Sequence, residues 1–511
     1  MVRWRATACQ AWYNASPNKS SNGFGKVTRW AAAGLMAVAA LMLPGLALAQ
    51  AWPQGTGPSL PADVDAALTR AKLPRDAISI LVQEVQAKTP ARLNHRTAVP
   101  VNPASVMKLV TTYAALDLLG PAFTWSTPVY VDGPVRDGVL QGNLIIKGQG
   151  DPKLVMERLW LLLRRVQGLG IRTITGDILL DRSAFDLPEV DPASFDGEPL
   201  RPYNAAPDAL LMNFKSVILT FQPDRAAGVA LVYAEPPLAG VQMPRSVPLQ
   251  AGECADYRAD LKADFSDPSR IRLLGGYPAS CGEKVWPVAY VEPRSYAARL
   301  VEGLWKDLGG QLGGRVRDGK VPAGLRPVFE QASPALADVV RDINKYSNNV
   351  MAQQVFLTLG LQLSRRGDAA AVAGFDASRE LVKSWWKERW PDADQPLLDN
   401  GSGLSRNERI TAQALGQMLL TAYQSPVMSE LLSSLPVAGV DGTLRRSKFR
   451  STQGAAHLKT GSLRDVAAIA GYVLAASGKR YVVVAVVNHP TLAGAARPVF
   501  DTLLDWTMND R

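Results

Sequence analysis

The chain has 511 residues, of which 47% are hydrophobic and 20% charged, and its formal net charge is +10. This composition is typical of globular proteins and excludes a disordered, collagen-like or polytopic membrane protein. A domain usually holds about 150 residues, so the length predicts several domains. Five basic residues and no acidic one lie in the first 49 residues, which leaves 51 basic against 46 acidic residues elsewhere. This small excess does not indicate a nucleic-acid partner.

The first predicted element is a signal peptide over residues 1–49. Its apolar stretch, Ala31–Ala49, follows Lys26 and Arg29 and ends in the small-x-small pattern that signal peptidases cleave. An uncleaved membrane anchor is the alternative, because nineteen apolar residues could nearly span a bilayer. We expect cleavage before Gln50 and export to the periplasm, and we leave open a loose association with the membrane.

Alternating strings predict strands in the rest of the chain, and helically spaced strings predict helices. Two strands are expected from Ile78 on, and a helix begins near Ala104 and stops before a Gly-Pro pair. An α+β module follows, and then short strands between proline-rich stretches up to about Val291. The last third is helical until 467–490, which predicts two strands joined by a turn, and a helix over 495–508 closes the chain.

Two of the three cysteines, Cys254 and Cys281, lie in the strand-rich part, 27 positions apart. In an exported protein such a pair indicates one structural disulfide, and two buried free thiols are the alternative. The third, Cys9, lies in the leader. The three histidines are scattered without the spacing of metal ligands, so we expect no metal site and no other cofactor.

A serine activated by a lysine is the chemistry that the sequence favours. No Gly-x-Ser-x-Gly elbow occurs, and three histidines leave little for a Ser-His-Asp triad. The pattern Ser-x-x-Lys begins at Ser16, Ser105 and Ser384. Ser16 lies in the leader, and Ser384 lies inside a helical stretch, where its amide is already bonded. Ser105 opens a helix with Lys108 one turn on, where a free amide and the helix dipole favour a developing anion.

Two further polar motifs follow in order. Ser347 and Asn349 form a Ser-x-Asn pattern that interrupts two helical stretches, so their side chains can turn outward at a helix start. Lys459-Thr460-Gly461 is the only Lys-Thr-Gly in the chain and opens a predicted strand, on which the glycine lets a substrate backbone approach closely. The order of the three motifs, each in its predicted context, makes the combination specific.

With these motifs the chain resembles the penicillin-interacting serine enzymes. It is most similar to the family of D-alanyl-D-alanine carboxypeptidases that includes penicillin-binding protein 4 (peptidase family S13), over almost the whole mature chain. The supporting strings are GDILLDRSAFD, RPYNAAPDALLMNF, DNGSGLSRNERIT, LPVAGVDGTL and HLKTGSLRDVAAIAGYV. Ser105 and Ser347 are 242 positions apart, against 112 from Ser347 to Lys459, and a large insertion between the first two motifs marks that family. Asn348, where the family often has Asp, is the one departure.

The resemblance implies the fold and its division into domains. We expect an α/β multidomain protein with the penicillin-binding-protein/β-lactamase-like transpeptidase fold, in which an antiparallel sheet is packed with helices. After the signal peptide, the catalytic domain would comprise residues 50–127 and 291–511. A large inserted region, part α+β and part β-rich, would occupy residues 128–290.

The resemblance and the side-chain chemistry together imply a serine-type D-Ala-D-Ala carboxypeptidase that is also a DD-endopeptidase. It would act on peptidoglycan stem peptides through an acyl-enzyme, and β-lactams would inhibit it covalently. Ser105 would attack the carbonyl of the penultimate D-alanine, neutral Lys108 would take its proton, and Ser347 would relay the proton to the leaving amine. Burial and the nearby Lys459 cation would both lower the pKa of Lys108.

The same resemblance implies which residues bind the substrate. Asn349 would hold its backbone amide, and the backbone amides of Ser105 and Ser462 would form the oxyanion hole. The terminal carboxylate would be bound by Lys459, Thr460 and Ser462. Asp196 and Glu198 are candidates for binding the amine of diaminopimelate in a cross-linked substrate, and a solvated acidic loop is the alternative interpretation.

Two rival functions share these features. A β-lactamase has the three motifs, but no Glu-x-x-Leu-Asn segment follows Ser347 to supply a deacylating glutamate, and the insertion is out of place in such an enzyme. A non-catalytic cell-wall-binding protein could have kept the fold, but the complete set of polar residues speaks against it. Trp385, Trp386 and Trp390 have helical spacing and are predicted to be core residues rather than a sugar-binding surface.

Overall fold

The computed structural model describes residues 60–86, 90–367, 371–445 and 454–510. The expected signal peptide and Cys9 lie outside the described residues. Among the helices that are described, none combines the length and the apolar character that a membrane crossing requires.

A five-stranded antiparallel sheet forms the centre of the part of the structure that contains both ends of the described chain, in the order β2-β1-β23-β22-β21. Its strands come from both ends of the chain: β1 (Ile78–Glu84), β2 (Leu93–His95), β21 (Ala456–Leu463), β22 (Val466–Leu474) and β23 (Arg480–Asn488). Seven consecutive residues of β23 are buried, because helices cover both faces of the sheet. The paired strands β22 and β23 confirm the hairpin expected over 467–490.

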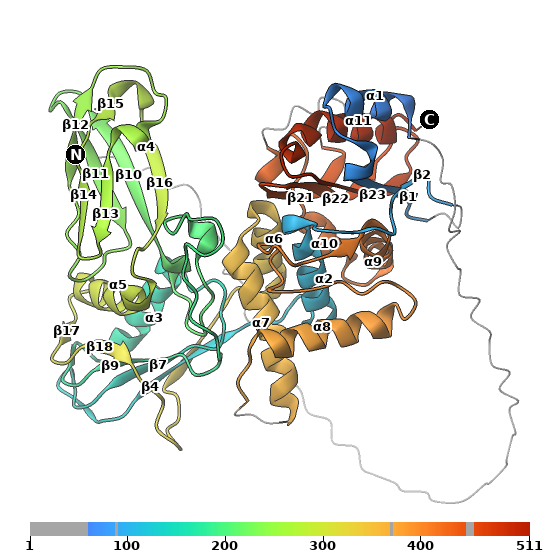
Figure 1. Ribbon diagram of the computed structural model, residues 1–511. Coiled ribbons are helices and arrows are strands. Elements are labelled where there is room, and N and C mark those ends of the chain that lie inside the picture. Colours follow the sequence, from blue (N-terminus) through green and yellow to red (C-terminus); the bar gives the residue numbers. More distant parts are fainter. Residues whose placement is uncertain (1–59, 87–89, 368–370, 446–453, 511) are drawn as a thin grey trace, which may run out of the picture. The chain divides into compact units, whose positions relative to one another are not determined.

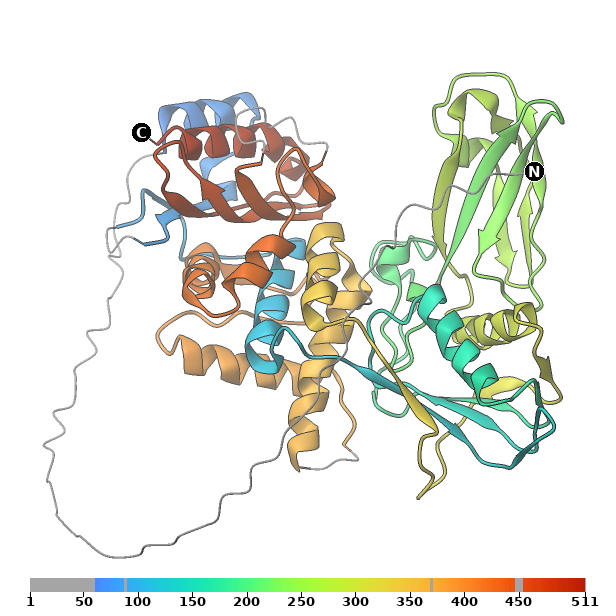
Figure 2. The ribbon, with the colours of Figure 1, turned by 180° about the vertical axis from the view of Figure 1, so that it is seen from behind.

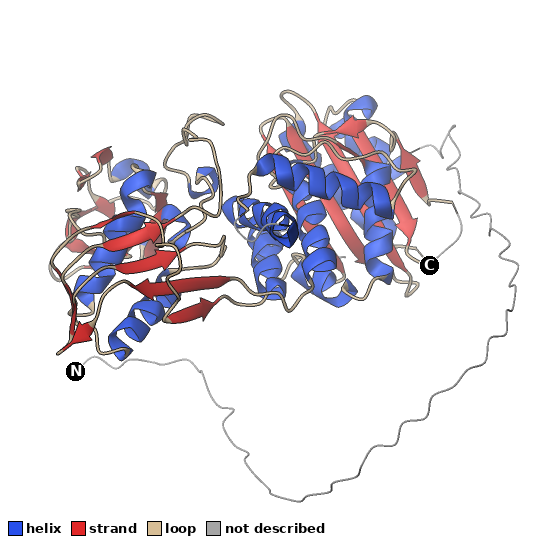
Figure 3. Ribbon diagram, turned by 90° about the horizontal axis from the view of Figure 1, so that it is seen from below, coloured by secondary structure: helices blue, strands red, loops and turns tan. Residues whose placement is uncertain are grey.

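Alternate residues of β23 point into two different cores, as the period of a strand requires. Val483, Ala485 and Val487 pack toward α1 (Ala62–Arg70) and α11 (Arg497–Met508). Val482, Val484 and Val486 pack into the larger core, which is made by helices seen against the strands in Figure 3. These are α2 (Lys108–Leu119), α6 (Leu336–Tyr346), α7 (Asn349–Gly367), α8 (Phe375–Arg389), α9 (Ala412–Gln424) and α10 (Met428–Ser434).

Helix α2 runs through the middle of this larger core. Its first nine residues, from Lys108 on, are all buried, so it is covered on every side. The rings of Trp385, Trp386 and Trp390 are at most 4% exposed and pack on one another and on Tyr113 of α2. The prediction that these tryptophans are core residues is therefore confirmed.

The inserted region has its own sheets and core (Figure 2). A five-stranded sheet has the order β18-β9-β7-β4-β19 and contains β4 (Ser126–Val131), β7 (Leu144–Lys147), β9 (Ile178–Asp181), β18 (Val316–Asp318) and β19 (Phe329–Ala332). A small sheet contains β5 (Val135–Arg136), β6 (Val139–Leu140), β8 (Thr173–Ile174) and β17 (Gln311–Leu312). The helices of this part are α3 (Met156–Gly168) and α5 (Pro293–Asp307).

The β-rich part of the insertion is a second five-stranded sheet, in the order β15-β12-β11-β10-β16. It contains β10 (Ser216–Asp224), β11 (Val229–Glu235), β12 (Ser246–Gln250), β15 (Tyr277–Pro278) and β16 (Lys284–Ala289). The short helix α4 (Tyr257–Asp260) and the hairpin of β13 (Ala263–Asp267) and β14 (Arg270–Leu273) lie within the same segment of chain.

The inserted region extends beyond the boundary at residue 290 expected from the sequence. Leu300, Leu304 and Trp305 of α5 are buried in the core of the insertion, and β19 pairs with β4. The core contacts thus group residues up to about 332 with the insertion. α5 has the spacing of an amphipathic helix, but spacing alone does not say which core a helix joins.

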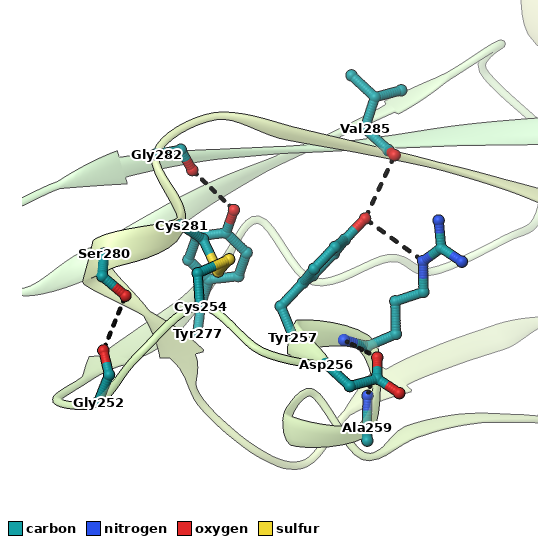
Figure 4. The surroundings of a disulfide bond; sticks show 11 residues. Gly252, Cys254, Asp256, Tyr257, Ala259, Tyr277, Ser280, Cys281, Gly282 and Val285 are labelled. Atoms are coloured by element: carbon teal, nitrogen blue, oxygen red, sulfur yellow. Dashed lines mark hydrogen bonds between the residues drawn. A yellow bond between two sulfur atoms is a disulfide. The ribbon is translucent and has the colours of Figure 1, made fainter. Parts of the chain in front are cut away.

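Cys254 and Cys281 are joined by a disulfide, as the even pair predicted. The bond ties the segment after β12 to the turn after β15 (Figure 4). Tyr277 lies beside it and donates its hydroxyl to the carbonyl of Gly282 at 2.7 Å. The bond therefore braces one end of the β-rich sheet.

We predict that replacing Cys254 and Cys281 together by serine lowers the free energy of unfolding by about 3 kcal/mol, because the bond restricts a loop of the unfolded chain. Denaturant unfolding of the variant and of the wild type, with and without reductant, measures this. Reduced wild type should match the variant. Two titratable thiols in denatured, unreduced wild-type protein would contradict the prediction.

Candidate active site

Ser105 lies in a tight turn at the start of α2. A 3-10 turn, Ala104–Met107, leads directly into the helix, which places the helix start where the sequence predicts it. Ala104 has a φ of 47°, a left-handed conformation that residues with a side chain rarely adopt. Asn102 stabilises it, since its Oδ1 accepts the amide of Ala104 at 2.8 Å and its Nδ2 donates to the carbonyl of Ser405. The turn is thus held from both sides.

The amine of Lys108 is fully buried one turn beyond Ser105. Its Nζ lies 3.0 Å from Ser105 Oγ and 2.6 Å from Asn349 Oδ1, and it also donates to the carbonyl of Ser402. Burial lowers the pKa of Lys108 to about 7, although the negative charge of Glu408 acts in the opposite direction. A large fraction of this amine is therefore unprotonated at neutral pH.

Ser347 lies between α6 and α7 and contacts the second buried lysine. Lys459 Nζ is 2.9 Å from Ser347 Oγ and 2.7 Å from the carbonyl of Thr460. Burial, and then the Lys108 cation, lower the pKa of Lys459 well below its usual value. The sequence predicts that the Lys459 cation lowers the pKa of Lys108. The repulsion between the two lysines is present, but it is the pKa of Lys459 that it lowers. The charge that acts on Lys108 is Glu408, which the motifs did not indicate.

Asn349 begins α7 and connects the lysine to the inserted region. Its Oδ1 accepts a hydrogen bond from Lys108, and its Nδ2 donates to the carbonyl of Tyr203 at 3.0 Å. Tyr203 belongs to the RPYN part of one of the strings that carry the resemblance. The orientation of the Asn349 amide therefore depends on the insertion.

Strand β21 lies at the edge of the sheet and brings the third motif to the same place. Its first half is covered by residues 436–438, since Ala438 donates to the carbonyl of Ala456 and Leu458 donates to that of Pro436, both at 2.9 Å. The second half, from Lys459 to Leu463, carries the Lys-Thr-Gly motif and the exposed Ser462. Among the described residues no further strand pairs with this half, and an open strand edge of this kind can pair with an extended peptide.

Two glycines lie against the turn that holds Ser105. A Cβ at Gly461 would lie 2.5 Å from the carbonyl oxygen of Pro103 and 3.2 Å from the amide nitrogen of Ser105. A Cβ at Gly403 would lie 2.0 Å from the carbonyl oxygen of Ala104. Only glycine fits at these positions, so β21 and the loop that contains Gly403 both touch the turn.

Three residues near the motifs were missed from the sequence. The hydroxyl of Thr443 lies 2.9 Å from that of Thr460, Ser402 supplies a carbonyl to Lys108, and Glu408 is a buried carboxylate. All three lie inside strings that carry the resemblance, which was the available signal. Their proximity to the motifs depends on chain folding and not on spacing.

The structure distinguishes between the two acidic candidates of the insertion. Asp196 is engaged within its own loop, because its carboxylate accepts hydrogen bonds from Tyr203 Oη at 2.9 Å and from Asn204 Nδ2 at 2.8 Å. The side chain of Glu198 is 56% exposed and lines a cavity of about 1130 Å³ that Ser347 and Asn349 also line. Glu198 is therefore the one of the two whose side chain lines this cavity, where it also forms an ion pair with Arg201 at 3.3 Å.

We predict that Gly461→Ala slows covalent labelling of Ser105 by a fluorescent penicillin by about a hundredfold, because the new methyl group would displace the turn. Gly494→Ala is the matched control, since a Cβ there meets nothing within 4 Å. The melting temperatures of both variants check that they fold. Equal labelling rates for the two variants would contradict the close contact between β21 and the turn.

The chain is similar to known peptidases along most of its length. The model of the D-Ala-D-Ala carboxypeptidase 3 (S13) family matches residues 60–508. A D-alanyl-D-alanine carboxypeptidase of Actinomadura sp. is 30% identical over 401 residues, which are 74% of this chain and 71% of that protein. The D-alanyl-D-alanine carboxypeptidase DacB of Haemophilus influenzae is 25% identical over 388 residues, which are 75% of this chain and 80% of that protein.

The fold is also that of a solved penicillin-binding protein. The crystal structure of penicillin binding protein 4 (dacB) from Haemophilus influenzae matches with a TM-score of 0.69 at 21% identity, over 87% of this chain and 99% of that chain. A second structure of that protein, complexed with a β-lactam, matches with a TM-score of 0.65 at 22% identity, over 86% and 99%. The expected fold class is therefore confirmed, and the chain belongs to the D-Ala-D-Ala carboxypeptidase 3 (S13) family of serine-type peptidases.

Proposed function

We propose that this peptidase removes the terminal D-alanine from peptidoglycan stem peptides through an acyl-enzyme on Ser105. One observation carries the proposal: a fully buried lysine, with a pKa lowered to about 7, lies 3.0 Å from the hydroxyl of a serine at a helix start. A lysine in this state can accept a proton at neutral pH, and an adjacent base is what a serine needs to become a nucleophile.

In the acylation step, Ser105 Oγ bonds to the carbonyl carbon of the penultimate D-alanine while its proton passes to Lys108. The backbone amides of Ser105 and Ser462 would stabilise the oxyanion that forms. The bond between carbon and nitrogen then breaks, and the leaving amine receives a proton through Ser347, which Lys459 holds at 2.9 Å. Water hydrolyses the ester in a second step, and Ser105 regains its proton.

The substrate would lie along the open half of β21. Its backbone amide would bind Asn349, and its terminal carboxylate would bind the cation and hydroxyls at the strand start, namely Lys459, Thr460 and Ser462. Thr443 lies against Thr460 and would add a hydroxyl to this group. A β-lactam would occupy the same place, and the Haemophilus influenzae protein has been solved in complex with one. Export to the periplasm would bring the enzyme to its substrate.

A DD-endopeptidase activity is the second part of the proposal. The cavity next to Ser347 and Asn349 has room for a larger leaving group than one amino acid, and Glu198 on its wall offers a carboxylate to a cationic amine. A cross-linked peptide with a free diaminopimelate amine has both features. Asp196, whose carboxylate is already bonded, would act by holding the loop in place.

We predict that Ser105→Ala abolishes covalent labelling by a fluorescent penicillin and hydrolysis of a D-alanyl-D-alanine pentapeptide, because it removes the hydroxyl that we propose forms the ester. Ser384→Ala, at an exposed position in the middle of α8, is the control and should be labelled as the wild type is. Label mapped to Ser384 by peptide mass spectrometry would overturn the assignment. Rapid turnover of the penicillin by wild type would indicate a β-lactamase, and no label at all a non-catalytic protein.

We predict that Glu198→Gln raises KM for a cross-linked dimer with a free amine by a factor of about 1.4 to 5, because an exposed ion pair contributes roughly 0.2 to 1 kcal/mol. A pentapeptide that lacks the free amine should keep its KM. Asp196→Asn is the companion variant and should affect both substrates to the same degree. An equal change for both substrates in Glu198→Gln would remove this carboxylate from the substrate site.

A further inference from the structure

Glu408 is a fully buried carboxylate at the base of a loop beside the lysine. Reciprocal backbone hydrogen bonds between Leu397 and Arg409, at 2.8 and 3.0 Å, close the loop. Glu408 Oε1 points into it and accepts three backbone amides, those of Asp399, Asn400 and Gly401, at 3.0 to 3.2 Å. One carboxylate oxygen therefore fixes the conformation of the turn.

The turn that Glu408 holds is the one that contacts the reactive groups. The carbonyl of Ser402 accepts a hydrogen bond from Lys108 Nζ, and the carbonyl of Gly401 accepts one from Thr111 Oγ1 of α2 at 2.6 Å. Gly403 lies against the carbonyl of Ala104, immediately before Ser105. A change in the turn would therefore move an acceptor of Lys108 and the support of Ser105 together.

The second carboxylate oxygen of Glu408 does not take part in these hydrogen bonds, and the carboxylate can act on its neighbours through its charge. Oε2 is buried and has no hydrogen-bond partner among the described residues. Burial raises the pKa of Glu408 to about 7, against the effect of its three amide donors. Asp399 in the turn also raises the pKa of Glu408, and Arg379 of α8 lies 3.9 Å from the carboxylate of Asp399. The charge that acts on Lys108 is that of Glu408.

We propose that Glu408 is a positioning residue for the reaction at Ser105. Its carboxylate holds the turn that aims the Ser402 carbonyl at Lys108, and its negative charge stabilises the ammonium that Lys108 becomes on taking the serine proton. The proton moves from Ser105 Oγ to Lys108 Nζ, and none is transferred to Glu408. This inference rests on the proposed function and adds a residue to its machinery.

The variant Glu408→Gln separates charge from shape, because its amide oxygen can still accept the three backbone amides. The rate of acylation by penicillin rises with pH as Lys108 loses its proton. Removing the negative charge makes that proton easier to lose, so the midpoint of the profile should move down by about one pH unit. The plateau rate should fall about tenfold, because the ammonium that forms is less stabilised.

Two further variants make the result decisive. Glu408→Asp keeps the charge, so its midpoint should stay near the wild-type value while acylation slows. This variant serves as the test if Glu408→Gln does not fold. A shifted midpoint in Glu408→Asp would overturn the proposal. Glu430→Gln is the control, since its Oε2 is also buried without a hydrogen-bond partner among the described residues but lies on α10. It should leave the profile unchanged.

Acylation of the wild type distinguishes a failure of this inference from a failure of the proposed function. If wild type is not acylated at any pH, the proposed function fails. If wild type is acylated with a midpoint near 7 and Glu408→Gln has the same midpoint, the proposed function stands and the role of Glu408 is overturned. If Glu408→Gln is acylated more slowly than wild type at every pH and its midpoint does not shift, Glu408 only supports the fold, and its proposed role is also overturned.

Discussion

Two lysine amines buried in one cleft are the constraint around which this enzyme is built. Removing a charged amine from water costs several kcal/mol unless it is paired or loses its proton. Both ways of avoiding this cost are found here. The pKa values of Lys108 and Lys459 are lowered, and every nearby element supplies acceptors: Ser347 before α7, Asn349 on it, and the carbonyl of Ser402 in the loop. The reactive state of the lysine is thus a consequence of its burial.

The insertion takes part in this arrangement through its contacts with α7. Asp208 and Gln354 exchange two hydrogen bonds, from the amide of Asp208 to Gln354 Oε1 at 3.0 Å and from Gln354 Nε2 to the carbonyl of Asp208 at 2.9 Å. Tyr203 adds the contact with Asn349. Tyr203 and Asp208 belong to the string RPYNAAPDALLMNF, so that string joins the insertion to α7, the helix that begins with Asn349.

The sequence predicted what depends on local pattern and order. The helix start at Ser105, the hairpin of β22 and β23, the tryptophan core and the disulfide all follow from spacing or residue type. Other features depend on which parts of the chain pack against one another in the folded structure. Periodicity could not assign α5 to the inserted core, and no pattern links Glu408 to Lys108 or Thr443 to Thr460. The resemblance to the family identified the sequence strings that contain Glu408 and Thr443, but it did not show which residues they contact.

The half-covered edge of β21 also bears on how the protein avoids associating with itself. An unpaired strand edge is a template on which other protein chains add strands and aggregate. Here residues 436–438 pair with the first half, and the open part from Lys459 to Leu463 spans only about 17 Å. A short peptide fits that length, whereas a longer strand would meet the covering segment. The short length of the edge at which we propose that substrate binds therefore limits the strand that another chain could add to it.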